Sequence, residues 1–190
     1  RGKSCIAWED VPPPRQSILC SRSFSNKLTS FSQLKEAVSY FVSSAAQKLR
    51  DQKMIAGYLS VFITTSPFDK KNIYYGNSSH VNLSPPTSFT GDLIKNAHIA
   101  LKEIFKAHLE YKKAGVLLGD FSDENLLQQD LFTSSKSFER KKRLSKAVDK
   151  INRKQKKQSV FFASEGIHPK WNSASTKKSP KYTSSWEEIL

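Results

Sequence analysis

The hydrophobic pattern between residues 16 and 119 alternates between strand-like and helix-like periods. Strand-like stretches occupy residues 16–24, 54–66, 73–83 and 112–119. Apolar residues at helical spacing fill about four to five turns after Ser30, and again about residues 92–108. The order strand, helix, strand, strand, helix, strand predicts an α+β unit of βαββαβ type. We expect a four-stranded sheet with both helices on one face and the other face bare.

Both helices have a predicted start and one apolar stripe. Ser30 and Gln33 form an S-x-x-Q pattern that predicts a capping box, and Ser88 or Thr90 is expected to cap the second helix. The first stripe consists of Leu34, Val38, Phe41, Ala45 and Leu49. The second consists of Ile94, Ala97, Leu101, Ile104 and Phe105. We interpret both stripes as core.

The strand at 58–66 carries apolar residues at both parities, so its inward face is ambiguous. We favour Leu59, Val61 and Ile63 facing the helices, which leaves Ser60 and Thr64 on the open face. The strand at 112–119 is too apolar for an exposed edge and is expected inside the sheet.

Two groups of polar side chains are candidate phosphate ligands. In the first strand, Ser21-Arg22-Ser23 combines two small hydroxyls with a guanidinium, a suitable set for phosphate oxygens. The alternative is that Arg22 is only a solvated charge. Lys70 and Lys71, in the predicted hairpin connection, either contact phosphate or lie in a solvated loop, and the solvated loop is the simpler interpretation.

The charge changes this picture, because it is large and unevenly distributed. Lys and Arg number 31 against 17 Asp and Glu, giving a net charge of +14. Such an excess favours nucleic acid as a partner, with an acidic protein or a membrane surface next. Residues 140–157 hold ten Lys or Arg and one acid. Because like charges four apart destabilise a helix, an anionic partner or salt must screen them.

The residues after 122 form a predicted C-terminal extension that is basic, helical and partly ordered. A linker at 123–136 leads into an extension at 137–190, with a helix at about 138–156 whose apolar stripe is Leu144, Val148 and Ile151. A short strand is possible at 159–163. Trp171, Tyr182 and Trp186 could anchor this region to the globule, stack on bases or mark a partner site.

The remaining composition argues against several classes of protein. Cys5 and Cys20 fit no metal-ligand spacing, and a reduced, cytoplasmic location is consistent with them. No signal peptide or apolar run of transmembrane length is present. Residues 1–14, with three consecutive prolines, are expected to be a stiff tether, and the start without methionine suggests a fragment.

Catalysis by this chain is not expected. His98 and His108 have no partner nearby in sequence and are interpreted as surface residues. The acidic stretch 120–124 is interpreted as a solvated turn, whereas nucleotidyl transfer needs clustered carboxylates that hold two metal ions. We therefore expect neither a metal site nor a cofactor.

Several stretches, in order, resemble the C-terminal part of UmuC-type Y-family DNA polymerases. They are Cys20-Ser21-Arg22-Ser23-Phe24, Thr65-Ser66-Pro67-Phe68, Tyr74-Tyr75-Gly76-Asn77, residues 111–121, Gly166, Trp171 and residues 179–186. The resemblance implies a little-finger domain at 15–122 followed by the extension that closes such proteins. Where the family usually has Thr-Arg before the last tryptophan, this chain has Ser184-Ser185, which puts any contact by that arginine in doubt.

The resemblance also implies function. In this family the open sheet face lies along primer-template DNA and grips phosphates without reading sequence. The strands that approach the backbone are those carrying Ser21 to Ser23, Ser60 to Thr65 and Lys112-Lys113. It further suggests a UmuD-type regulatory subunit and RecA as partners, without assigning residues to them, and a role in SOS mutagenesis and DNA repair.

A sliding-clamp peptide is the second implied site. Gln128-Gln129-Asp130-Leu131-Phe132 is similar to the bacterial clamp motif Gln-x-x-Leu-Phe. An extended segment could place Leu131 and Phe132 in an apolar pocket while the Gln128 amide hydrogen-bonds beside it. The alternative is that Leu131 and Phe132 fold back onto the globule.

Two other binding classes stay open. An RNA-recognition motif has the same element order, but its aromatic signature is absent, and Tyr74-Tyr75-Gly76 is the nearest approach. A pure adaptor would dock to the clamp or a regulatory subunit with little DNA contact.

Overall fold

The computed structural model describes residues 15–69, 74–124, 135–155, 158–167, 171, 179–180 and 182–186. For residues 135–137 it describes the backbone alone. Tether residues 1–14, Lys70, Lys71 and the proposed clamp peptide therefore lie outside the described residues.

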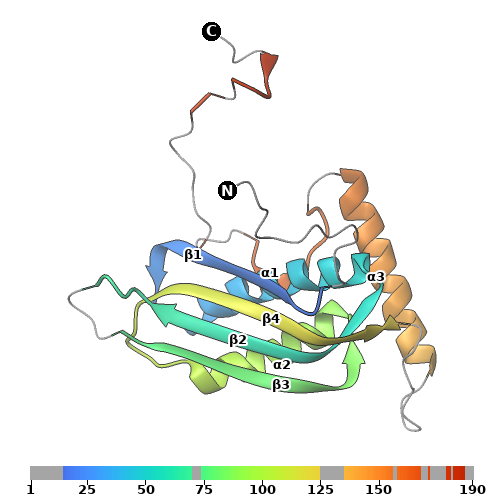
Figure 1. Cartoon of the computed structure of the whole chain (residues 1–190), viewed down its shortest axis with the longest axis horizontal. Helices are drawn as coiled ribbons and strands as arrows, with labels where there is room; N and C mark the ends of the chain where they lie inside the picture. Colours follow the sequence, from blue (N-terminus) through green and yellow to red (C-terminus); the bar gives the residue numbers. More distant parts are fainter. Residues whose placement is uncertain are drawn as a thin grey trace, which may run out of the picture.

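The predicted βαββαβ order is confirmed (Figure 1). The elements are β1 (Ile18–Leu28), α1 (Phe31–Asp51), β2 (Met54–Thr65), β3 (Gly76–Thr87), α2 (Thr90–Ile104) and β4 (Tyr111–Asp123). The extension adds α3 (Ser135–Gln155) and the short 3-10 helix η2 (Ala163–Glu165). The four strands form one antiparallel sheet in the order β1-β4-β2-β3, so β4 lies inside the sheet as its apolar composition predicts.

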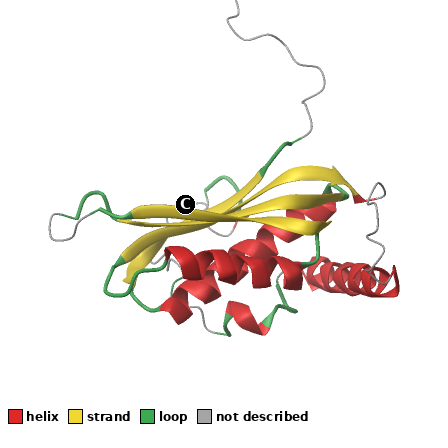
Figure 2. Ribbon diagram, turned by 90° about the horizontal axis from the view of Figure 1, so that it is seen from below, coloured by secondary structure: helices red, strands yellow, loops and turns green. Residues whose placement is uncertain are grey.

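The core lies between the sheet and the two helices. Figure 2 shows α1 and α2 beneath one face of the sheet, and no described helix covers the other. Leu59, Val61 and Ile63 on β2 are fully buried against the helices, as expected. On β1, Ile18 and Cys20 are buried and Leu19 is exposed, the alternation expected of a strand with one covered face.

Neither predicted helix cap forms. Helix α1 begins after Ser30, but the Ser30 side chain makes no capping hydrogen bond. Helix α2 is preceded by Phe89 rather than Ser88. Thr90 instead accepts a hydrogen bond from the Arg50 guanidinium at 3.0 Å, so its hydroxyl is used in a tertiary contact.

Helix α2 also ends earlier than predicted, at Ile104. Phe105 is extended, and its ring packs against Phe31 and Tyr111 at centroid distances of 5.1 and 5.8 Å. The Tyr111 hydroxyl accepts a hydrogen bond from the backbone N–H of Lys106 at 2.8 Å. Aromatic packing and this hydrogen bond replace the last helical turn that the sequence predicted.

Two further predictions about local structure are wrong. The stretch 120–124 is not a solvated turn, because β4 continues to Asp123 and Glu124 forms an ion pair with Lys142 at 3.2 Å. The predicted strand at 159–163 is absent, since the backbone N–H groups of Ser159 and Val160 donate to the Asn152 side chain on α3.

The extension packs on the outer surface of α1. Trp171 is fully buried and contacts the rings of Phe24, Tyr40 and Phe41. The buried Glu165 carboxylate accepts a hydrogen bond from Ser43 on α1 at 2.7 Å. Of the three roles considered for the extension's aromatics, Trp171 takes that of anchor.

Helix α3 packs through its polar side. Ser145 and Asp149 are buried, whereas Leu144 and Ile151, two members of the predicted apolar stripe, are about half exposed. No helix in the described ranges is both long and apolar enough to cross a membrane.

Candidate nucleic-acid interface

The open sheet face is built from residues that the strand register places in rows. Paired residues in an antiparallel sheet point to the same face. Because Ala114, Val116 and Leu118 on β4 are buried against the helices, the alternate residues of β4 point outward. The register then fixes which residues of the other strands share that outward face.

The most polar row runs through Lys113. Lys113 pairs with Ser23 on β1 and with Thr64 on β2, so it stands between two hydroxyl-bearing residues on neighbouring strands. The ammonium also lies 5.9 Å from the centroid of the Phe62 ring. This row brings together three of the residues that the sequence singled out.

In the next row, a glycine on β4 leaves room for the aromatic ring of Phe62 on β2. Ser21 pairs with Gly115, and Gly115 pairs with Phe62. A Cβ atom at Gly115 would meet the Phe62 ring at 2.4 Å and the Ser21 Cβ at 2.5 Å. Only a glycine therefore lets the ring lie across β4 at this point.

Two more rows continue the surface toward the start of β2. Leu19, Leu117, Ser60 and His80 form one row, and Gly119, Tyr58 and Asn82 form the other. The Ser60 hydroxyl donates to the backbone carbonyl of Ser79 at 3.2 Å. Tyr58 and His80 stack, with ring centroids 5.5 Å apart. None of the paired residues in these rows is acidic, so the surface is well suited to an anion.

Arg22 and Lys112 are placed differently from their neighbours. Arg22 pairs with Ala114, so it has the parity of the buried residues and is exposed only because β1 is an edge strand. Lys112 lies where the β2–β4 register shifts, and its ammonium donates to the Ser25 carbonyl at 3.1 Å. The structure thus places Ser21, Ser23, Ser60, Thr64 and Lys113 on one face, but not Arg22.

One further cation near this surface is already engaged. Lys27 forms ion pairs with Asp69 and Glu110, the second at 2.7 Å. The hydrogen bonds that Lys27 donates to these two carboxylates raise its pKa. Lys27 is therefore a fixed structural charge.

The chain matches two known domain families. The model of the impB/mucB/samB family C-terminal domain matches residues 15–131, which include the whole sheet. The chain belongs to the impB/mucB/samB family. This confirms the UmuC-type resemblance drawn from the sequence. A second model, a domain of unknown function (DUF4113), matches residues 142–190.

Curated relatives of this family match nearly the whole chain. SamB of Salmonella typhimurium is 38% identical over 99% of the chain, and UmuC of Salmonella typhimurium strain LT2 is 35% identical over 100%. The chain spans 44% and 45% of their lengths. Among solved structures, an insertion ternary complex of Dbh DNA polymerase has 14% identity and a TM-score of 0.45, covering 59% of this chain and 31% of that one.

The sequence analysis did not identify the aromatic residues on the open face. Tyr58 and Phe62 point outward, although the apolar content of β2 alone did not reveal it. The signal was available in β4, where Gly115 and Gly119 stand opposite these two rings. A glycine inside a strand marks close approach of another group.

Proposed function

We propose that this chain is the DNA-binding C-terminal part of a UmuC-type translesion DNA polymerase. Its open sheet face would hold the phosphate backbone of primer-template DNA without reading base sequence. The observation that carries the proposal is the row Ser23–Lys113–Thr64, in which a lysine pairs with two hydroxyl-bearing residues and none of the residues paired along the face is acidic. Ammonium and hydroxyl groups are the usual ligands of phosphate oxygens, and such contacts carry no sequence information.

The charge supports the same proposal. A net charge of +14 attracts a polyanion over the whole molecule, whereas the open face decides where a duplex lies. Arg22 and Lys112 would contribute from the β1 edge rather than from the face itself. Lys70 and Lys71 remain proposed contacts, although they lie outside the described residues.

The test compares two single charge reversals. Lys113→Glu should weaken binding to primer-template duplex and lower the slope of log affinity against log salt by about 0.9, the value of one lost phosphate contact. Lys102→Glu is the matched control, because Lys102 is exposed on α2, beneath the opposite face of the sheet. Equal losses in the two variants would contradict the proposal.

We propose that nucleotidyl transfer belongs to the part of the relatives that this chain does not span. Two-metal catalysis requires clustered carboxylates. Among the described residues no group of three His, Cys, Asp or Glu side chains is arranged to hold a metal ion. The chain would therefore bind and position DNA for a catalytic centre elsewhere.

A sliding clamp is a proposed second partner. Gln128, Leu131 and Phe132 would form the clamp peptide, in a segment that follows β4 in the sequence. Replacing Leu131 and Phe132 by alanine should abolish clamp binding and leave duplex affinity unchanged. A UmuD-type subunit and RecA are further proposed partners, and a cytoplasmic location would suit all three.

A second candidate function is favoured by Tyr58 and Phe62 on the open face. Outward aromatic rings on a sheet are the usual platform for stacking single-stranded bases. Under this alternative Phe62→Ala would weaken single-strand binding more than duplex binding. The duplex proposal predicts that Lys113→Glu weakens duplex binding more than single-strand binding.

A further inference from the structure

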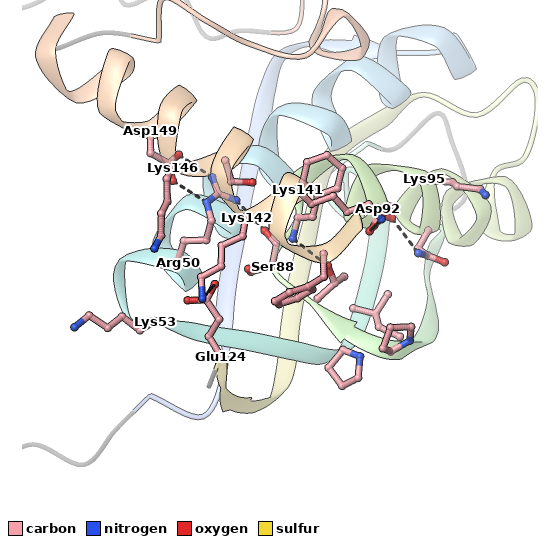
Figure 3. A pocket seen from close by; sticks show the side chains of 18 of the residues that line it. Arg50, Lys53, Ser88, Asp92, Lys95, Glu124, Lys141, Lys142, Lys146 and Asp149 are labelled. Carbon is pink, nitrogen blue, oxygen red and sulfur yellow. Dashed lines mark hydrogen bonds and ion pairs between the residues drawn. The ribbon is translucent and has the colours of Figure 1, made fainter. Parts of the chain in front are cut away.

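A groove of about 1100 Å³ lies between α3 and one end of the sheet (Figure 3). Its walls come from five elements: the end of α1, the end of β3, the start of α2, the exit from β4 and the polar side of α3. This end of the sheet is where β2 begins and where β3 and β4 finish. The groove therefore adjoins the last row of the open face, with which it shares Asn82, and lies at the other end of the sheet from the row through Lys113.

All four carboxylates that line the groove are already paired. Asp149 binds Arg50 at 2.7 Å, Asp92 binds Lys141 at 2.7 Å and Glu124 binds Lys142 at 3.2 Å. Asp51 forms an ion pair with Arg153. Each negative charge of the groove is thus neutralised by a cation that also lines it.

Four lysines of the groove are left without an ion pair from any residue that the structure describes. They are Lys53, Lys95, Lys146 and Lys150. In Figure 3, Lys53, Lys95 and Lys146 extend away from the paired carboxylates. With every acid neutralised, the groove keeps four uncompensated positive charges, together with amide groups from Asn82 and Asn96.

We propose that this groove binds the phosphate backbone of single-stranded nucleic acid. Four unpaired ammonium groups along one groove complement a chain of regularly spaced phosphates. A duplex is stiff over about 150 base pairs, so one that lies on the open face does not bend around the end of the sheet. A single strand leaving that duplex is flexible enough to enter the groove. This inference goes beyond the open-face proposal but rests on it for the choice of a single strand, since the duplex on that face supplies the strand.

The test removes the four groove charges and compares the result with a matched loss of charge elsewhere. The groove variant carries Lys53→Gln, Lys95→Gln, Lys146→Gln and Lys150→Gln. The control variant carries Arg140→Gln, Arg143→Gln, Lys154→Gln and Lys102→Gln, four exposed cations that do not line the groove. Both variants have the same net charge, and circular dichroism and thermal unfolding establish that both are folded.

Binding is measured by fluorescence anisotropy on three probes: an oligothymidine, a blunt duplex and the same duplex with a single-stranded tail. The groove variant should lose affinity for oligothymidine, and its log–log salt slope should fall by about 0.7 for each contact removed. The tail should strengthen binding of the wild-type chain and of the control variant, but not of the groove variant. Blunt-duplex affinity should stay equal in the two variants.

Two results would overturn the inference. Equal loss of oligothymidine affinity in both variants would show a general charge effect. Wild-type affinity in the groove variant would exclude nucleic acid and leave the groove to an acidic protein. Failure of the open-face proposal is a separate result, because it would appear as weak blunt-duplex binding that Lys113→Glu does not change.

Discussion

The Arg50 guanidinium on α1 and the Asp149 carboxylate on α3 form a two-point ion pair, with Nε–Oδ2 and Nη2–Oδ1 distances of 2.7 and 2.8 Å. Arg50 also donates to the Ser88 carbonyl at 2.9 Å. A single guanidinium therefore joins the sheet domain, the start of α2 and the extension. Arg50 lies in the part matched by the family domain and Asp149 in the part matched by the domain of unknown function.

Loss of this pair should loosen α3 from the sheet domain. Asp149→Asn leaves the largely buried Arg50 charge unpaired, and we expect a loss of about 2 kcal/mol in the free energy of unfolding. Asp51→Asn is the matched control, because its partner Arg153 is largely exposed, and it should cost less than about 0.5 kcal/mol. Urea denaturation of both variants measures the difference, and equal losses would refute the assigned role of Arg50.

Trp171 should account for much of the attachment of the extension. Trp171→Ala removes a fully buried ring from its contacts with Phe24, Tyr40 and Phe41, at a cost of about 3–5 kcal/mol. Trp171→Phe should cost less, because the indole N–H has no hydrogen-bond partner among the described residues. Trp186→Ala is the control, since Trp186 is 91% exposed, and thermal unfolding should not distinguish it from wild type.

Two glycines of β4 should respond oppositely to the same substitution. Gly115→Ala places a Cβ 2.4 Å from the Phe62 ring and should cost about 1–3 kcal/mol while displacing that ring on the open face. At Gly119 the nearest atom, of Tyr58, lies at 3.5 Å, an ordinary contact. Gly119→Ala should be neutral or slightly stabilising, because alanine costs less conformational entropy than glycine. Similar destabilisation at both sites would contradict the described packing.

The free energy of unfolding should fall as the pH is lowered below about 6.5, because His98 takes up a proton more readily in the unfolded chain. Burial, together with the nearby Lys35 charge, lowers the pKa of His98 below its usual value of 6.5. The unfolded chain then binds a proton in a pH range where the folded chain does not, so lowering the pH favours unfolding until the folded pKa is passed. The neutral ring is held by a 2.8 Å hydrogen bond to Ser39, whose own hydroxyl proton goes to the Lys35 carbonyl.

Urea denaturation at pH 7.5 and at pH 5 tests this assignment. His98→Gln should be less stable than wild type at pH 7.5 but should lose less on acidification. His108→Gln is the control, because His108 is exposed. An unchanged pH dependence in His98→Gln would show that another group is responsible.

The topology of the sheet domain could be predicted from the sequence because strand and helix periods alternate clearly. The pattern alone did not show which side of β2 faces the helices, because Tyr58 and Phe62 make its outward side apolar as well. Glycines on the neighbouring strand explain those rings, but a sequence does not show which residues stand opposite one another before the register is known. Residues Ser21 and Ser23 were recognised by chemistry and Lys113 through the family resemblance, whereas the parity of Arg22 was overlooked.

The attachment of α3 could not be predicted from local pattern. An apolar stripe predicts the buried side of most helices, but α3 packs through Ser145 and Asp149 and leaves Leu144 exposed. The partners of its charges lie far away in sequence, as Arg50 and Asp149 are 99 positions apart. The predicted Thr90 cap failed for a similar reason, because the Thr90 hydroxyl accepts a hydrogen bond from Arg50, 40 positions away in sequence.

The central claim is that the open sheet face grips duplex phosphates without reading sequence. Fluorescence anisotropy of the whole chain, on a primer-template duplex and on a single strand of the same sequence, tests it most directly across a range of salt concentrations. We predict a preference for the duplex, a steep salt slope and little change when the base sequence is altered. A preference for the single strand with a shallow slope would contradict the claim and point to base stacking on Tyr58 and Phe62.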